Sequence, residues 1–147
     1  MTNGPDVFAT IGATVRAMRG RLDRSLQDAG LRLGQYQLLR LLWDRDGRTP
    51  RELSEGLEVE MPTVTRTVQR LLRDGFVRRE AHPDDARSVR IYLTDRGTQA
   101  RECVSEILAC ETERALEGFD GPERERLVEL MERIAQNVRH DEASPRA

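Results

Sequence analysis

The middle of the chain carries three helical patterns in a row, and this order constrains the fold more than any other feature. Apolar residues at three- and four-residue steps predict helices from Gln35 to Asp46 and from Met61 to Asp74. Between them, Thr49-Pro50-Arg51-Glu52 is typical of a helix start, because a threonine cap, a proline in the first position and a glutamate three residues on form a capping box. We therefore expect a short third helix between two longer ones.

Two strand patterns follow the last of these helices. Phe76–Glu80 and Val89–Leu93 read as strands, and the polar segment 81–88 between them reads as a hairpin loop. Helix, short helix, turn, helix and β-hairpin is the order of a winged helix-turn-helix. The predicted fold is mainly α with a small β-hairpin wing, and its winged-helix lobe covers residues 35–94.

Long helical patterns flank this lobe at 6–30 and 95–140, within what we expect to be a single domain over 1–147. Thr94 suits a helix cap, and Asp120-Gly121-Pro122-Glu123 predicts the start of a last helix. The first and last helices each have one apolar stripe, and a chain this small offers no partner for either. We expect both to be buried in a second copy, as dimerisation helices. The stripes comprise Phe8, Ile11, Val15, Met18, Leu22 and Leu26, then Leu127, Leu130, Met131, Ile134 and Val138.

Composition narrows the function classes. No apolar run approaches the ~20 residues of a membrane span, and residues 1–10 lack the pattern of a signal peptide, so we expect a cytoplasmic protein. The two cysteines and two histidines have no metal-ligand spacing, so neither a metal nor another cofactor is expected. Catalytic arrangements and a phosphate loop are missing from the sequence, which disfavours an enzyme.

The charge pattern favours a nucleic acid as partner. Pro62–Arg90 contains seven arginines and four acids, whereas Ala100–Ala147 contains seven arginines and twelve acids. A basic middle joined to an acidic end suits a phosphate-binding lobe on a module that stays off DNA.

Candidate DNA-contacting side chains lie on the predicted helix 61–74. Short hydroxyl side chains bring a backbone close to DNA, arginine reaches guanine edges or phosphates, and glutamine pairs with adenine. An arginine in the hairpin loop, Arg87, fits a neighbouring minor groove. The alternative is that the helix arginines only face solvent and bind nothing, which the accompanying hairpin disfavours. The helix candidates are Thr63, Thr65, Arg66, Gln69 and Arg70.

These segments resemble the signature of the MarR family of regulators. The resemblance rests on Pro62-Thr63-Val64-Thr65-Arg66, Asp74-Gly75-Phe76-Val77-Arg78-Arg79, Asp85-Ala86-Arg87-Ser88, and Leu93-Thr94 followed by Gly97. It covers most of the chain. It implies a homodimer whose first, fifth and sixth helices interleave, with two recognition helices in successive major grooves of a pseudo-palindromic operator, half-sites roughly 10 base pairs apart. Carried over, the major-groove residues are Pro62, Thr63, Thr65, Arg66 and Arg70, the wing arginine is Arg87, and Asp85 supports the wing by pairing with a nearby arginine.

The resemblance also implies a ligand-responsive regulator, most often a repressor, with small anionic aromatic molecules as effectors. Tyr36 and Trp43 are candidates for lining an effector pocket, although core packing is the favoured alternative. Arg16 is a candidate for neutralising a ligand carboxylate, with a solvated or intersubunit salt bridge as the favoured alternative.

Two other readings stay open. Cys103 and Cys110 are seven residues apart on one predicted helix, which leaves a thiol-based redox switch as an alternative. The peroxide-sensing branch of the resembled family uses a cysteine in its first helix, which this chain lacks, so inert buried cysteines are preferred. A winged helix that docks a protein instead of DNA is the remaining alternative.

Overall fold

The structure is a computed structural model that describes residues 6–143, except the side chains of His82, Ala86, Arg87 and residues 140–143. It comprises two compact units, Met1–Glu111 and Thr112–Ala147. The elements of the chain are α1 (Val7–Gln27), α2 (Leu33–Asp44), α3 (Pro50–Leu57), α4 (Met61–Arg73), β1 (Val77–His82), β2 (Asp85–Leu93), α5 (Asp95–Ala115) and α6 (Gly121–Ala143). The two strands form one antiparallel sheet. The mainly α fold with a hairpin wing is therefore confirmed.

Helix α3 begins as the sequence predicts. The Thr49 hydroxyl accepts a hydrogen bond from the Glu52 N–H at 3.2 Å, and the Glu52 carboxylate accepts one from the Thr49 N–H at 2.7 Å. Pro50 occupies the first helical position. The Thr49 N–H, with Arg45 beside it, lowers the pKa of Glu52 from 4.5 to about 2. The capping box is therefore formed and charged at neutral pH.

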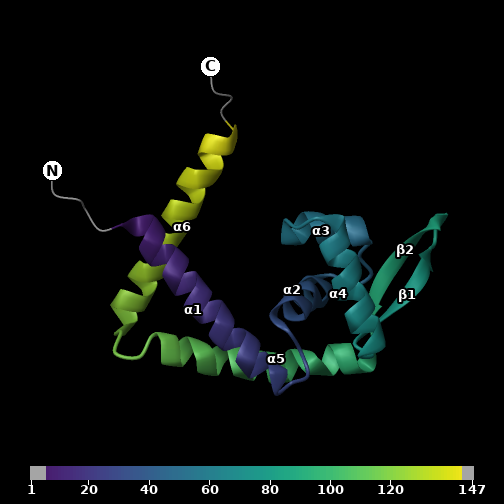
Figure 1. The fold of residues 1–147 in the computed structure, drawn as a ribbon, viewed down its shortest axis with the longest axis horizontal. Coiled ribbons are helices and arrows are strands. Elements are labelled where there is room, and N and C mark those ends of the chain that lie inside the picture. The colour runs from purple at the N-terminus through teal and green to yellow at the C-terminus, as the bar shows by residue number, and fades with distance from the viewer. Residues whose placement is uncertain (1–5, 144–147) are drawn as a thin grey trace. The chain divides into compact units, whose positions relative to one another are not determined.

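The core of the first unit lies where α2, α3, α4 and the hairpin meet (Figure 1). Leucines of α2 and α3 pack against the inner face of α4, while Phe76 and Ile91 close the side toward the strands. Tyr36 and Trp43 are half-buried against this core, with ring centroids 6.5 Å apart. Apolar burial on this scale holds α4 by one face and leaves the other in water. The fully buried side chains include Leu38, Leu39, Leu42, Leu53, Val64 and Leu71.

Thr94 and Gly97 connect the hairpin to α5. The Thr94 hydroxyl donates to the Gly75 carbonyl at 2.7 Å and accepts from the Gly97 N–H at 3.1 Å, so the predicted cap is formed. A Cβ on Gly97 would lie 2.1 Å from the Phe76 carbonyl oxygen, which only glycine avoids. The close packing of α5 against the segment that follows α4 thus explains the Leu93-Thr94-x-x-Gly97 pattern.

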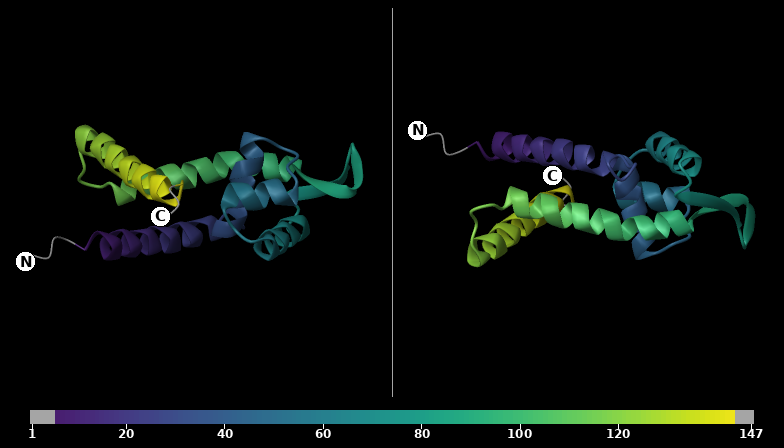
Figure 2. Two further views of the ribbon diagram at one scale, coloured as in Figure 1. Left: turned by 90° about the horizontal axis from the view of Figure 1, so that it is seen from above. Right: turned by 90° about the horizontal axis from the view of Figure 1, so that it is seen from below.

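The predicted hairpin loop over 81–88 is wrong. The turn is only Pro83 and Asp84, and the strands extend to His82 and from Asp85. The register changes between Ala81, which pairs with Val89, and His82, which pairs with Asp85. Polar residues enter the ladder here because main-chain hydrogen bonds need no particular side chain. The hairpin projects away from the helices in both views of Figure 2.

The second unit holds the end of α5 and helix α6. The Asp120 carboxylate accepts from the Glu123 N–H at 2.8 Å, and the Glu123 carboxylate accepts from the Asp120 N–H at 3.0 Å, so the second capping box is also formed. Arg124 pairs with Glu113 at 2.8 Å and donates to the Leu116 carbonyl, which ties α6 back to the turn. Across the described residues of both units, every helix is too short or too polar to cross a membrane.

Candidate nucleic-acid interface

Helix α4 presents a polar face to solvent. Val64, Val68 and Leu71 are buried on its inner face. At 100° per residue, the side chains on the other positions point outward. All six predicted contact residues on this helix are exposed: Pro62, Thr63, Thr65, Arg66, Gln69 and Arg70. The structure thus places them together on one face of one helix.

The hydroxyls of α4 are oriented by the helix backbone. Thr65 Oγ1 donates to the Met61 carbonyl at 3.0 Å, and Thr67 Oγ1 donates to the Thr63 carbonyl at 2.9 Å. The hydroxyl hydrogen of such a threonine is used in the bond to the helix backbone, so the side chain offers its hydroxyl oxygen as an acceptor and its methyl group. Those groups suit exocyclic amines and the thymine methyl in the major groove.

Arg66 and Arg70 carry charge that the rest of α4 does not neutralise. Among the described residues, neither guanidinium lies within ion-pair distance of a carboxylate. By contrast, Arg51 pairs with Glu55 on α3 at 3.0 Å, and Arg73 pairs with Asp74 at 2.9 Å. An exposed guanidinium without a carboxylate keeps five donors for a phosphate or a guanine edge.

On its hairpin side, α4 shares a small pocket of about 80 Å³ with β1, lined in part by Thr65, Gln69 and Arg79. Arg79 pairs in register with the buried Ile91, whereas Arg78 lies over the Tyr92 ring, 5.0 Å from its centroid. Side chains alternate along a strand, so Arg78 and Arg79 point to opposite faces. The sequence prediction missed Arg79, although alternation requires one of two adjacent arginines to face α4.

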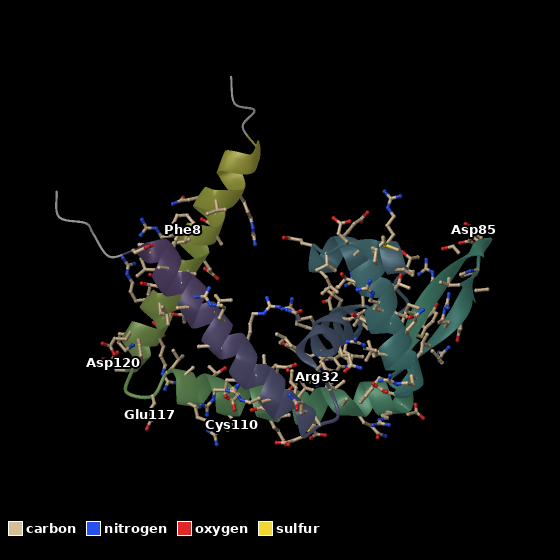
Figure 3. All side chains as sticks on the ribbon, viewed as in Figure 1. Phe8, Arg32, Asp85, Cys110, Glu117 and Asp120 are labelled. Carbon is tan, nitrogen blue, oxygen red and sulfur yellow. The ribbon has the colours of Figure 1, made fainter. Side chains whose placement is uncertain are left out.

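The tip of the hairpin holds the two predicted wing residues. Figure 3 shows Asp85 at the far end of the hairpin, where it is exposed at the start of β2. The backbone of Arg87 lies within β2, not in the turn, and its side chain lies outside the described residues. The minor-groove role of Arg87 and the supporting role of Asp85 stay predictions.

Comparison with known proteins identifies the fold. The family model for the MarR family matches residues 31–89, which include α2, α3, α4 and most of the hairpin. The winged-helix lobe that these residues form is therefore that of the MarR family. The chain is a DNA-binding transcriptional regulator and not an enzyme.

Several relatives of the chain match over most of its length. The HTH-type transcriptional regulator YybA of Bacillus subtilis is 25% identical over 136 residues, 92% of this chain and 91% of the relative. The HTH-type transcriptional repressor YetL of the same organism is 27% identical over 128 residues, 86% of this chain and 77% of the relative. The crystal structure of a MarR transcriptional regulator from Methanosarcina mazei matches with a TM-score of 0.81 and 25% identity, over 89% of this chain and 94% of that one.

A second pocket of the MarR fold lies between α2 and α5. It measures about 290 Å³, and its lining includes Tyr36, Arg40, Trp43 and Arg101. The Trp43 Nε1–H donates to the Gly97 carbonyl at 2.8 Å, which fixes the indole at the pocket wall. Two of the three predicted ligand residues therefore meet here, whereas Arg16 is not among the lining residues.

The expected burial of both cysteines is wrong. Cys103 and Cys110 are exposed free thiols on α5. The face of α5 that packs against the core is centred on the buried Val104. Cys103 lies 100° from it and Cys110 about 120°, so both point away from that face.

Proposed function

We propose that this MarR family regulator is a cytoplasmic homodimer that binds a pseudo-palindromic operator in double-stranded DNA and acts as a repressor. The observation that carries the proposal is the exposed face of α4, where Arg66 and Arg70 lack carboxylate partners among the described residues. A helix fixed by its buried stripe presents these unneutralised arginines in a defined geometry, which suits an anionic partner of fixed shape.

Base reading falls to the N-terminal half of α4. Thr63 and Thr65 approach base edges, Arg66 reaches guanine, and Gln69 reaches adenine. Arg87 supplies the minor-groove contact, and half-sites lie roughly 10 base pairs apart, as two-fold symmetry requires.

The dimer is supported by apolar surface that the monomer leaves in water. On α1, Phe8 is 89% exposed, and Val15 and Met18 are each more than 40% exposed. On α6, the exposed apolar side chains are Leu127, Val128, Leu130, Met131, Ile134 and Val138. Contiguous apolar stripes of this kind mark interfaces, and a second copy supplies matching stripes.

Selection of bound sequences from random duplex DNA, followed by titration of the winning site, tests the proposal. Arg66→Ala should weaken operator binding by about 1–3 kcal/mol, which is roughly 5- to 150-fold, and relax preference at one base position. Arg126→Ala is the matched control, since Arg126 is an exposed arginine on α6 paired with Glu129. Equal losses from the two variants would count against base reading by α4.

The α2–α5 pocket is the proposed effector site, for a small aromatic acid. Arg40 and Arg101 supply positive charge, while Tyr36 and Trp43 supply aromatic surface. Because Trp43 is the only tryptophan in the chain, its fluorescence reports occupancy directly. An effector should quench it and release the operator, and Arg40→Gln should weaken both effects together. Quenching without release would separate binding from regulation.

Exposure of Cys103 and Cys110 favours thiol-based regulation as a second candidate. The organic hydroperoxide resistance transcriptional regulator of Bacillus subtilis is 30% identical over 95 residues, 65% of this chain and of that one. This chain has no cysteine in α1, so the candidate rests on the exposure of Cys103 and Cys110. Peroxide should then release the operator from the unmodified protein and leave the Cys103→Ser, Cys110→Ser double variant bound. Equal behaviour of the two proteins would exclude it.

A further inference from the structure

A pocket at the C-terminal end of α4 carries charge that the proposed base contacts do not use. It measures about 380 Å³ and lies where the turn between α1 and α2 meets the C-terminal end of α4. Figure 3 labels Arg32 at this turn. The lining residues, all within the first unit, are Gln27, Gly30, Leu31, Arg32, Gln35, Arg70, Arg73 and Asp74.

The lining of this pocket carries a net positive charge. Three guanidinium groups, those of Arg32, Arg70 and Arg73, face one carboxylate, that of Asp74, among the lining residues. Arg32 reaches Asp23 through Nη1 alone at 3.1 Å, and Arg73 reaches Asp74 through Nε and Nη2. Each therefore keeps guanidinium donors beyond its carboxylate partner.

A buried side chain holds the two walls of the pocket together. Gln35 is 4% exposed, its amide donates to Asp74 Oδ2 at 3.0 Å, and its Oε1 accepts from the Arg32 backbone N–H at 2.9 Å. One residue thus bonds to the start of α2 and to the end of α4. Arg32 consequently stands on a wall fixed relative to Arg70 and Arg73.

The pocket continues the DNA-facing side of α4. Arg70 and Arg73 follow Arg66 by four and seven residues, so they lie within about 40° of it and roughly 6 and 10 Å further along the axis. A recognition helix reads bases with its N-terminal residues, and the major groove is about 12 Å wide. Side chains this far along the helix reach the groove wall, where the phosphates are.

We propose that Arg32, with Arg70 and Arg73, binds a backbone phosphate of the operator at the wall of the major groove. The inference rests on the proposed function and adds Arg32 and Arg73 to its contacts. A phosphate of DNA fits better than a free small anion, because the Arg32 and Arg73 side chains are 61% and 74% exposed. Small-ligand sites bury most of their ligand.

Salt dependence measures the contact. Arg32→Gln removes one phosphate contact per protomer and two per dimer, so the slope of log K against log salt should fall by about 1.8. Operator and random duplex should lose affinity by the same factor, since phosphates carry no sequence. Arg32→Lys, which keeps the charge, and Arg126→Gln, on α6, should leave the slope near wild type. Circular dichroism checks that each variant is folded.

A scan of operators with single neutral methylphosphonate linkages locates the phosphate. One position in each half-site should weaken the wild type and have no further effect on Arg32→Gln. No such position, or an unchanged salt slope, overturns the proposal while wild-type operator binding leaves the proposed function intact. Loss of sequence-selective binding by the wild type would instead refute the proposed function. Arg32-dependent stabilisation by inorganic phosphate, without coupling to any linkage, would assign the pocket to a free anion and also overturn the proposal.

Discussion

Replacing Gly97 by alanine tests how α5 is seated on the winged-helix lobe. The added Cβ would lie 2.1 Å from the Phe76 carbonyl oxygen, and real Cβ contacts do not fall below 3.0 Å. Backbone must therefore move by roughly 1 Å, because neither atom belongs to a flexible side chain. The same carbonyl accepts from the Thr94 N–H at 3.1 Å, and the Gly97 carbonyl accepts from Trp43 at 2.8 Å. Overpacking costs about 1–3 kcal/mol and each of the two weakened hydrogen bonds about 0.5–1.5 kcal/mol, so we expect a loss of about 2–6 kcal/mol.

Urea unfolding followed by circular dichroism and Trp43 fluorescence measures the loss at fixed protein concentration. Gly34→Ala is the matched control, because Gly34 is exposed on α2 and its added Cβ meets nothing within 4 Å. That variant should be unchanged or stabilised by up to about 1 kcal/mol. If Gly97→Ala were as stable as Gly34→Ala, the close approach of α5 to Phe76 would be wrong.

Three further predictions concern the cap of α3, the hairpin side of α4 and the dimer. The pKa of Glu52 is lowered from 4.5 to about 2, so its stabilisation of the fold is complete above pH 4.5 and is lost as the pH falls toward 2. In urea titrations, the difference in stability between wild type and Glu52→Gln should therefore close over that range. A difference independent of pH would contradict the capping role. Arg79→Gln should lower the slope of log K for DNA binding against log salt, because Arg79 lines a pocket with Thr65 and Gln69 and has no carboxylate partner among the described residues. An unchanged slope would mean that Arg79 does not contact DNA. Phe8→Asp should shift sedimentation toward the monomer, since Phe8 is 89% exposed in the single chain, and a variant as dimeric as wild type would remove α1 from the interface.

Local rules predicted the helices well. Both capping boxes form, because a side chain and a main-chain group three residues apart find each other within one helical turn. The inner stripe of α4 was likewise readable, since Val64, Val68 and Leu71 recur at helical spacing. Residues whose role is set within a few positions are the ones that sequence reasoning recovers.

Tertiary placement decided what the sequence reading missed. Cys103 adjoins Val104 in the sequence, yet only the packing of α5 shows which of the two faces the core. Asp85 and its neighbours joined β2 because of main-chain pairing, which side-chain preferences do not report. Arg32 lies far from α4 in sequence, and the packing of α2 against α4, together with the Gln35–Asp74 hydrogen bond, brings it alongside.

Spacing between half-sites tests the central claim most directly. In the unaltered operator, both half-sites lie on one face of the duplex. Inserting five base pairs between them turns one half-site to the opposite face. A dimer with two α4 helices should bind the unaltered operator with one dimer per duplex and bind the five-base-pair insertion no better than random duplex. Equal affinity for the two duplexes would contradict paired recognition helices as the basis of binding.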